Sequence, residues 1–137
     1  MLKSKELADE FWATQVTPEL PVQESAASSR AMFMLDTSLS SSPDKFNVWL
    51  KLLETTLANN RDTMKEFGVL MFSVDGHFWK PNYVANTADN AAELKDTLQN
   101  VVLEGATDLY AATQKVTTTD WVIDGQAPDL FLSLIHI

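Results

Sequence analysis

Oxygen-bearing side chains follow an apolar segment near residue 36. The sequence AMFMLDTSLSSSP, residues 31–43, ends its apolar run at Asp36, and Ser38 and Ser40 follow at alternate positions. Such a run predicts a strand buried on both faces, with Asp36 at its carboxyl end. A carboxylate and two hydroxyls at this place suit a hard divalent cation, because Mg2+ takes oxygen ligands. The spacing therefore predicts a cation site at the end of a strand.

A second motif, Gly105-Ala106-Thr107-Asp108, comes just before a predicted helix. In sheets of parallel strands, the loops at the carboxyl ends of adjacent strands line one crevice. We therefore expect this loop to open beside Asp36. Asp108 is expected to cap the helix that follows rather than to bind a cation.

The elements that must position these motifs alternate between strand and helix. Apolar patterns predict strands over residues 31–35, 67–74 and from 130 onward, and helices over residues 44–60, from 87 or 89 to before 105, and 109–116. Leu94, Leu98, Val101 and Val102 are expected on the inner face of the second helix. The first of these helices is expected to begin with Ser42 as its N-cap and Pro43 at its first helical position.

A turn at Asp75-Gly76 predicts that residues 77–84 return antiparallel to the second strand. Pro81 weakens that strand, because proline cannot donate to a sheet. The fold class is therefore α/β, with a central, mostly parallel sheet and one antiparallel edge strand.

Composition excludes several classes of function. Ten Lys and Arg against 19 Asp and Glu give a net charge of −9, which disfavours a nucleic-acid partner. The chain has no cysteine, so disulfides, thiolate metal sites and cysteine catalysis are excluded. No apolar run approaches the roughly 18 residues that span a bilayer. The composition does not indicate the cellular compartment of the protein.

The two motifs, in this order along the chain, resemble those of the von Willebrand factor A domain. An Asp-x-Ser-x-Ser sequence follows an apolar strand, and a Gly-x-Thr-Asp loop later opens a helix. The resemblance covers residues 31–131 and implies a Rossmann-like fold with a metal-ion-dependent adhesion site. It implies that Ser38, Ser40 and Thr107 ligate Mg2+ or Mn2+, and that Asp36 does so directly or through water.

The same resemblance implies a function and a missing ligand. The family supplies a further aspartate after its fourth strand, whose approach here is Asp129-Leu130-Phe131. The implied function is a non-enzymatic binding module, in which a protein partner offers an acidic side chain to the metal. Within the family, the likeness is to bacterial domains that follow an inter-alpha-trypsin-type domain.

Four segments are expected along the chain. Residues 1–17 are interpreted as the tail of an upstream domain, 18–30 as a linker, and 31–131 as the amino-terminal part of the binding domain. The last six residues, LSLIHI, resemble a translated sequencing adaptor, so residues 132–137 are interpreted as an artefact and the domain as truncated in its fourth strand. Leu132 and Ser133 can coincide with native residues.

Two other functions remain open. Asp36 could act as the nucleophile of a Mg2+-dependent phosphohydrolase, although that family places a second aspartate where Ser38 stands. Alternatively, the hydroxyls cap the first helix in a structural domain without metal. His77 stands alone and is interpreted as non-catalytic, Asp75 as a turn residue, and Trp79 as a core or rim residue that could offer an apolar contact surface.

Overall fold

The structure is a computed structural model that describes residues 28–39, 41 and 43–133. The strands are β1 (Arg30–Asp36), β2 (Glu66–Phe72), β3 (Gly76–Phe78), β4 (Val84–Ala85) and β5 (Asp129–Ser133). The helices are α1 (Pro43–Asn59), α2 (Ala88–Gln99), α3 (Leu109–Thr118) and α4 (Asp120–Ile123). No helix in these ranges combines the length and hydropathy needed to cross a bilayer.

One sheet organises the elements. Its strand order is β3-β2-β1-β5, with β4 also paired to β2. β1 is parallel to both β2 and β5, whereas β3 and β4 run antiparallel to β2. The predicted fold class is therefore confirmed.

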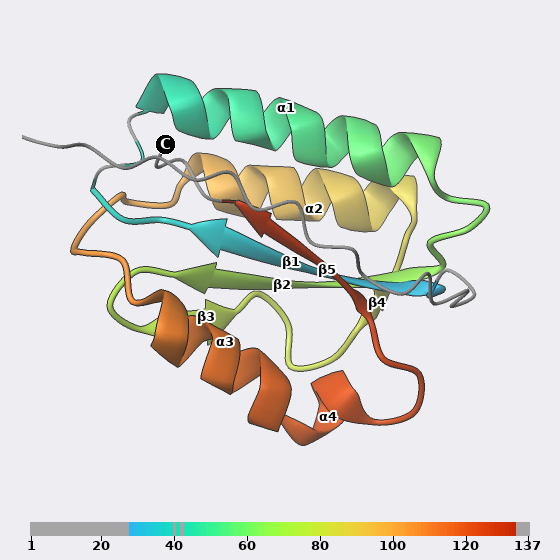
Figure 1. The fold of residues 1–137 in the computed structure, drawn as a ribbon. Coiled ribbons are helices and arrows are strands. Elements are labelled where there is room, and N and C mark those ends of the chain that lie inside the picture. The colour runs from blue at the N-terminus through green and yellow to red at the C-terminus, as the bar shows by residue number, and fades with distance from the viewer. Residues whose placement is uncertain (1–27, 40, 42, 134–137) are drawn as a thin grey trace, which may run out of the picture.

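Helices cover both faces of the sheet, with α1 and α2 on one side and α3 and α4 on the other (Figure 1). Successive side chains of a strand point to opposite faces. Accordingly Phe33 of β1 packs with Leu53 of α1 and Leu94 of α2, while its neighbour Met34 packs with Val116 of α3. This two-sided burial explains why β1 is continuously apolar.

The helix starts agree with the capping predictions that the structure can test. The Thr87 side chain accepts from the Asn90 N–H, and Asp108 Oδ1 accepts from the Ala111 N–H at 2.8 Å. Of the two caps predicted for α2, Thr87 is the one observed. The role of Ser42 at the start of α1 lies outside the described residues.

Three details differ from the sequence predictions. The return strand predicted over residues 77–84 is divided into β3 and β4, and the break contains Pro81, which has no N–H for the sheet. Val102 does not face the core, because α2 ends at Gln99 and the Val102 side chain is 74% exposed. The short helix α4 was not predicted.

Trp79 is held by packing. Its ring stacks on Phe67 at 5.9 Å between centroids, and its Nε1 donates to Thr97 Oγ1 at 3.2 Å. These contacts place the side chain between β2 and α2, in agreement with the core or rim interpretation.

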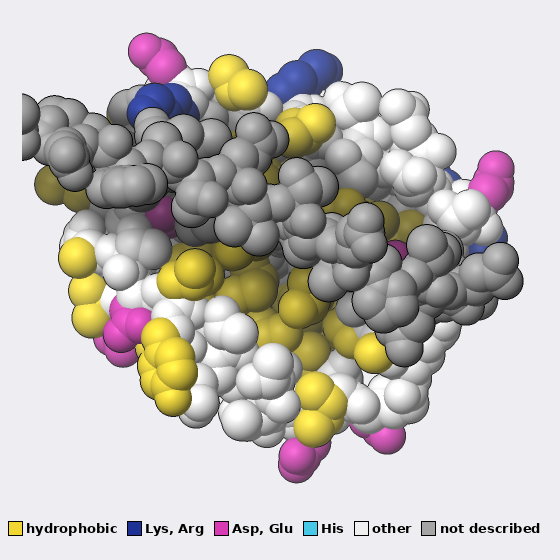
Figure 2. All heavy atoms as spheres, in the orientation of Figure 1, with side chains coloured by type: hydrophobic (Ala, Val, Ile, Leu, Met, Phe, Trp, Pro, Cys, Tyr) yellow, Lys and Arg dark blue, Asp and Glu magenta, His cyan; other side chains and the backbone are white. Residues whose placement is uncertain are grey.

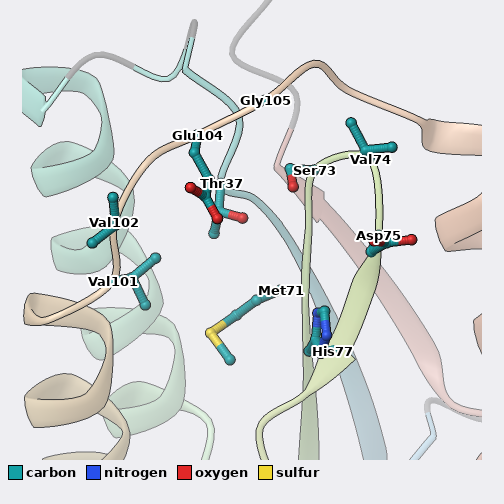
Figure 3. Close-up of a pocket in the computed structure, with 10 residues that line it drawn as sticks. All are labelled: Thr37, Met71, Ser73, Val74, Asp75, His77, Val101, Val102, Glu104 and Gly105. Atoms are coloured by element: carbon teal, nitrogen blue, oxygen red, sulfur yellow. The ribbon is translucent and has the colours of Figure 1, made fainter.

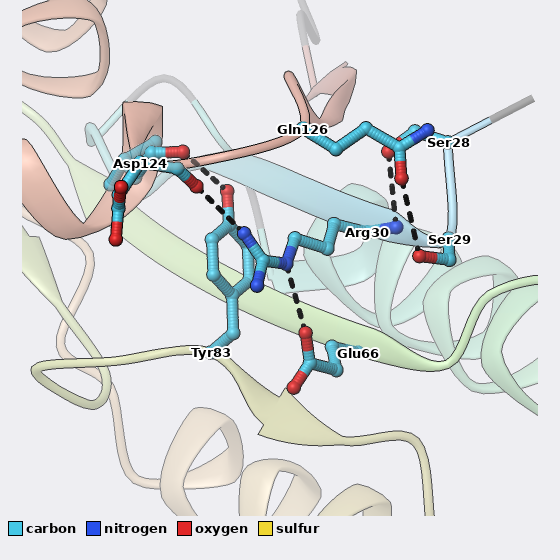
Figure 4. A network of polar contacts seen from close by, with 8 residues as sticks. Ser28, Ser29, Arg30, Glu66, Tyr83, Asp124 and Gln126 are labelled. Atoms are coloured by element: carbon cyan, nitrogen blue, oxygen red, sulfur yellow. Dashed lines mark hydrogen bonds and ion pairs between the residues drawn. The ribbon is translucent and has the colours of Figure 1, made fainter.

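Arg30 joins the amino-terminal ends of the strands to the segment between α4 and β5 (Figure 4). Its Nε donates to Glu66 Oε2 at 2.9 Å, and its Nη1 donates to the Asp124 carbonyl at 2.8 Å. The guanidinium lies 5.3 Å from the centroid of the Tyr83 ring. Burial raises the pKa of Tyr83 to about 12, although nearby Arg30 acts in the opposite direction. This cluster fixes the chain that leads into β5.

Candidate metal site

Asp36 ends β1 with a side chain that is completely buried. Its Oδ1 accepts from the Ser38 N–H at 2.9 Å, which turns the chain sharply at the end of the strand. The Ser41 hydroxyl donates to the Asp36 carbonyl at 3.1 Å and holds the same turn. Ser38 is also completely buried. The apolar strand therefore delivers a carboxylate and a hydroxyl to one enclosed place.

Thr107 completes a compact set of oxygens. Its Oγ1 lies 3.1 Å from Asp36 Oδ2 and 2.9 Å from Ser38 Oγ. Thr107 is 71 residues from Asp36 in the sequence, so the fold brings them together. The sequence prediction that the two motifs open beside each other thus agrees with the observed geometry.

Backbone bonds set the position of the loop that carries Thr107. The Glu104 N–H donates to the Thr37 carbonyl at 3.0 Å, and the Leu39 N–H donates to the Gly105 carbonyl at 3.1 Å. Gly105 has φ +76°, in the left-handed region that glycine adopts without steric cost. Farther along, the Asp108 N–H donates to the Ser73 carbonyl at 2.8 Å. The loop is therefore bonded to the ends of both β1 and β2.

Thr107 Oγ1 is as far from Asp36 Oδ2 and from Ser38 Oγ as adjacent ligands of Mg2+ are from each other. Ligands at about 2.1 Å in an octahedron lie about 3.0 Å from their neighbours. The distances from Thr107 Oγ1 to Asp36 and Ser38 agree with that edge length. Carboxylate and hydroxyl oxygens are also the donors that Mg2+ and Mn2+ prefer. The donor set therefore fits a hard divalent cation.

The charge of Asp36 gives a second reason to consider a cation. No lysine or arginine in the part of the chain that the structure describes forms an ion pair with this carboxylate. Its contacts within that part are with a backbone N–H and a hydroxyl. Burying a carboxylate without a counter-charge is costly. A bound cation would compensate for that cost.

The other candidate residues lie elsewhere or cannot be placed. Ser40, predicted as a ligand, lies outside the described residues. Asp108 caps α3, and the Asp75 carbonyl accepts from the Ser73 N–H at 2.9 Å in the turn between β2 and β3. Asp129 begins β5 beside Ala31, at the opposite end of the sheet from Asp36.

Sequence reasoning did not single out Ser41, which supports the turn after Asp36. The run of hydroxyl residues after Leu39 was a signal that one of them could bond to the backbone. Across residues 28–39, 41 and 43–133, no three His, Cys, Asp or Glu side chains gather as a metal-ligand group. The candidate site is therefore defined by hydroxyls around a single carboxylate.

A cavity of about 540 Å³ lies beside this site. It is bounded by the turn between β2 and β3 and by the segment from Val101 to Gly105 (Figure 3). Thr37, the neighbour of Asp36, also lines it.

Comparison with solved structures identifies the fold. The pilus adhesin SpaC from Lactobacillus rhamnosus GG, in its open conformation, is 10% identical with a TM-score of 0.61, covering 80% of this chain and 15% of that one. A von Willebrand factor type A protein from Catenulispora acidiphila is 14% identical with a TM-score of 0.50, covering 66% and 22%. No protein-family model and no curated protein matches the sequence.

Proximal thread matrix protein 1 from the mussel byssus, with a zinc-occupied metal-ion-dependent adhesion site motif, is also similar. It is 16% identical with a TM-score of 0.52, and the match covers 77% of this chain and 30% of that one. The chain thus spans less than a third of the length of these three structures. At such identities the likeness concerns the fold, and the fold of this chain is that of the von Willebrand factor A domains.

Proposed function

We propose that this domain is a metal-ion-dependent protein-binding module. A divalent cation, Mg2+ or Mn2+, would be held by Asp36, Ser38, Ser40 and Thr107. The observation that carries the proposal is the buried Asp36 carboxylate, which shares a set of closely spaced oxygens with Ser38 and Thr107. The similar fold of a pilus adhesin and of a protein with a zinc-occupied motif supports an adhesive role.

A bound cation would supply a positive charge at the surface of an acidic domain and would accept a carboxylate from a partner. Asp36, Ser38, Ser40 and Thr107 would hold the cation, and a coordination position would remain for the carboxylate of the partner. A phosphohydrolase with Asp36 as its nucleophile is disfavoured because Ser38 stands where that family has a second aspartate. We therefore expect no Asp36-dependent hydrolysis of para-nitrophenyl phosphate when Mg2+ is added.

Exposed apolar side chains around the candidate site support a protein partner. Leu39, Val74 and Tyr110 are 72%, 54% and 75% exposed, and each lies in or beside a loop at the carboxyl end of the sheet. In Figure 2, separate hydrophobic side chains lie at the end of the molecule where β1 and β2 end, with acidic atoms beside them, and the larger hydrophobic area lies in the middle of the face. A partner protein bound at the candidate site would bury these side chains at the interface.

The first test is calorimetric titration of the full chain with Mg2+ and with Mn2+. We expect saturable binding that Asp36→Asn abolishes and that Asp62→Asn, a matched change at an exposed position, leaves intact. Paramagnetic broadening by Mn2+ should be strongest for the amide signals of Ser38 and Thr107. Equal binding by the wild type and Asp36→Asn would contradict the proposed site.

The second test addresses the carboxylate partner. The probe is a short blocked peptide with one aspartate, compared with the same peptide carrying asparagine. We expect the aspartate peptide to bind only when the cation is present and to be released by excess EDTA. Binding that is unchanged in EDTA would contradict the metal-dependent mechanism.

A further inference from the structure

The cavity beside the candidate metal site is lined by both apolar and polar side chains, and Glu104 is the acidic side chain that faces into it. Its volume of about 540 Å³ is in the range of roughly 300–1,000 Å³ that is usual for ligand pockets. Met71 from β2 and Val101 from the loop after α2 point toward each other across it (Figure 3). Glu104 extends into the space from the loop above, beside Thr37.

The acidic side chains and the histidine at this cavity lack partners in the described part of the chain. Glu104 is exposed and forms no hydrogen bond or ion pair through its side chain there, and the same holds for Asp75 and His77. No lysine or arginine lines the cavity. Asp75 lies at the rim, with its side chain directed away from Met71. Within the described residues, the Glu104 carboxylate at this cavity therefore has no cationic partner.

A side chain with an apolar stem and a cationic end matches both parts of the cavity. Arginine and lysine bury their methylene groups against apolar surface and keep the charge at a polar edge. Arginine adds a planar fork of donors that pairs with a carboxylate. Met71 and Val101 would contact the stem, and Glu104 would meet the charge.

We propose that this cavity binds an arginine or lysine side chain of the partner protein. The proposal rests on the proposed function in that the same partner gives its carboxylate to the metal. Glu104 is three residues before Thr107, so their Cα atoms are at most about 11 Å apart. The partner would therefore present an acidic and a basic residue two or three positions apart on an extended segment.

The two binding events would share one loop. Glu104 and Thr107 belong to the same segment, and the Glu104 N–H bonds to the Thr37 carbonyl next to Asp36. A ligand that fixes this loop at the cavity would also fix the oxygen of Thr107. Binding of the cationic side chain and binding of the metal should therefore strengthen each other by the same factor.

The first experiment needs no metal. Agmatine, which carries a guanidinium on an aliphatic stem, is titrated into the full chain in EDTA and followed by NMR at the Met71 methyl group and the His77 ring. We expect saturable shifts with a dissociation constant on the order of 1–10 mM, as suits a small ligand. Signals of Met71 and His77 that stay unchanged throughout the titration would overturn the proposal.

Substitutions identify the carboxylate responsible. Glu104→Gln should weaken agmatine binding by about two- to fivefold, the usual size for one accessible ion pair. Asp96→Asn removes the same charge from an exposed position on α2 and should leave binding unchanged. If both variants weaken binding equally, the effect is one of net charge and the assignment to the cavity is wrong.

A peptide experiment separates this proposal from the metal-site proposal. Blocked peptides with one aspartate and one arginine two or three positions away are compared, in Mg2+, with peptides in which citrulline replaces arginine. We expect the arginine peptides to bind more tightly, and the advantage to be lost in Glu104→Gln. Metal-dependent binding with no preference for arginine would leave the proposed function standing and overturn the cavity assignment.

Discussion

At the scale of single residues, the Thr107 hydroxyl lies within hydrogen-bond distance of two oxygens but has only one proton to donate. A cation can interact with all three oxygens at once. We expect Thr107→Val to lower the affinity for Mg2+ by roughly tenfold or more. Calorimetry measures the change, with Thr113→Val on the exposed side of α3 as control. Unchanged affinity in Thr107→Val would remove this residue from the ligand set.

Tyr83 gives a prediction about pH. Burial raises its pKa to about 12 from the ordinary value of 10.0, so its proton is held more tightly in the folded chain than in the unfolded one. The resulting stability is present below pH 10 and is lost as the pH rises toward 12. Urea unfolding across this range should show a smaller loss for Tyr83→Phe than for the wild type. Tyr110→Phe, at an exposed position, should behave like the wild type.

Much of the candidate site could be predicted from residue types and their order. A carboxylate at the end of an apolar run and a threonine in a loop before a capped helix indicated that Asp36, Ser38 and Thr107 would meet. The backbone bonds that align the loop, from Glu104 to Thr37 and from Leu39 to Gly105, could not be predicted. They join main-chain atoms of two loops that are distant in the sequence, and no local residue pattern predicts them.

At the scale of elements, α1 offers a test of its amphipathic packing. Leu53 is 2% exposed and packs in the core, whereas its neighbour Leu52 is 56% exposed. Leu53→Ala should lower the free energy of unfolding by about 2–5 kcal/mol, because it removes buried methyl groups and leaves a cavity. Leu52→Ala should change it by only about 0.5 kcal/mol. Urea denaturation compares the two, and similar losses would contradict this orientation of the helix.

Long periodic elements were predicted well, and short ones were not. For α1, Pro43 was predicted as the first helical residue and residue 60 as the last, and the observed helix is Pro43–Asn59, because the apolar repeat extends over several turns. The four residues of α4 are too few to show a repeat. Its place depends on Trp121, which packs edge to face against Phe78 and Tyr83. Such long-range contacts cannot be predicted from a local sequence pattern.

At the scale of the whole molecule, a bound cation should stabilise the fold. An ion that binds only the folded chain adds about 2.7 kcal/mol when its concentration is 100 times its dissociation constant. We therefore expect Mg2+ to raise the thermal midpoint of the full chain and EDTA to reverse the effect. Asp36→Asn should show no such rise. An equal rise in both proteins would mean that the cation stabilises the chain at another place.

The separation of 71 residues between Asp36 and Thr107 has a consequence for folding kinetics. Contacts between distant segments must close a long loop and tend to form late. We therefore expect the oxygens to come together after β1, β2 and the helices between them have assembled. If these contacts are absent from the folding transition state, a bound cation should slow unfolding and leave the rate of folding nearly unchanged. In stopped-flow measurements, Mg2+ should then displace only the unfolding limb, which would make the ion a marker for the last step of assembly.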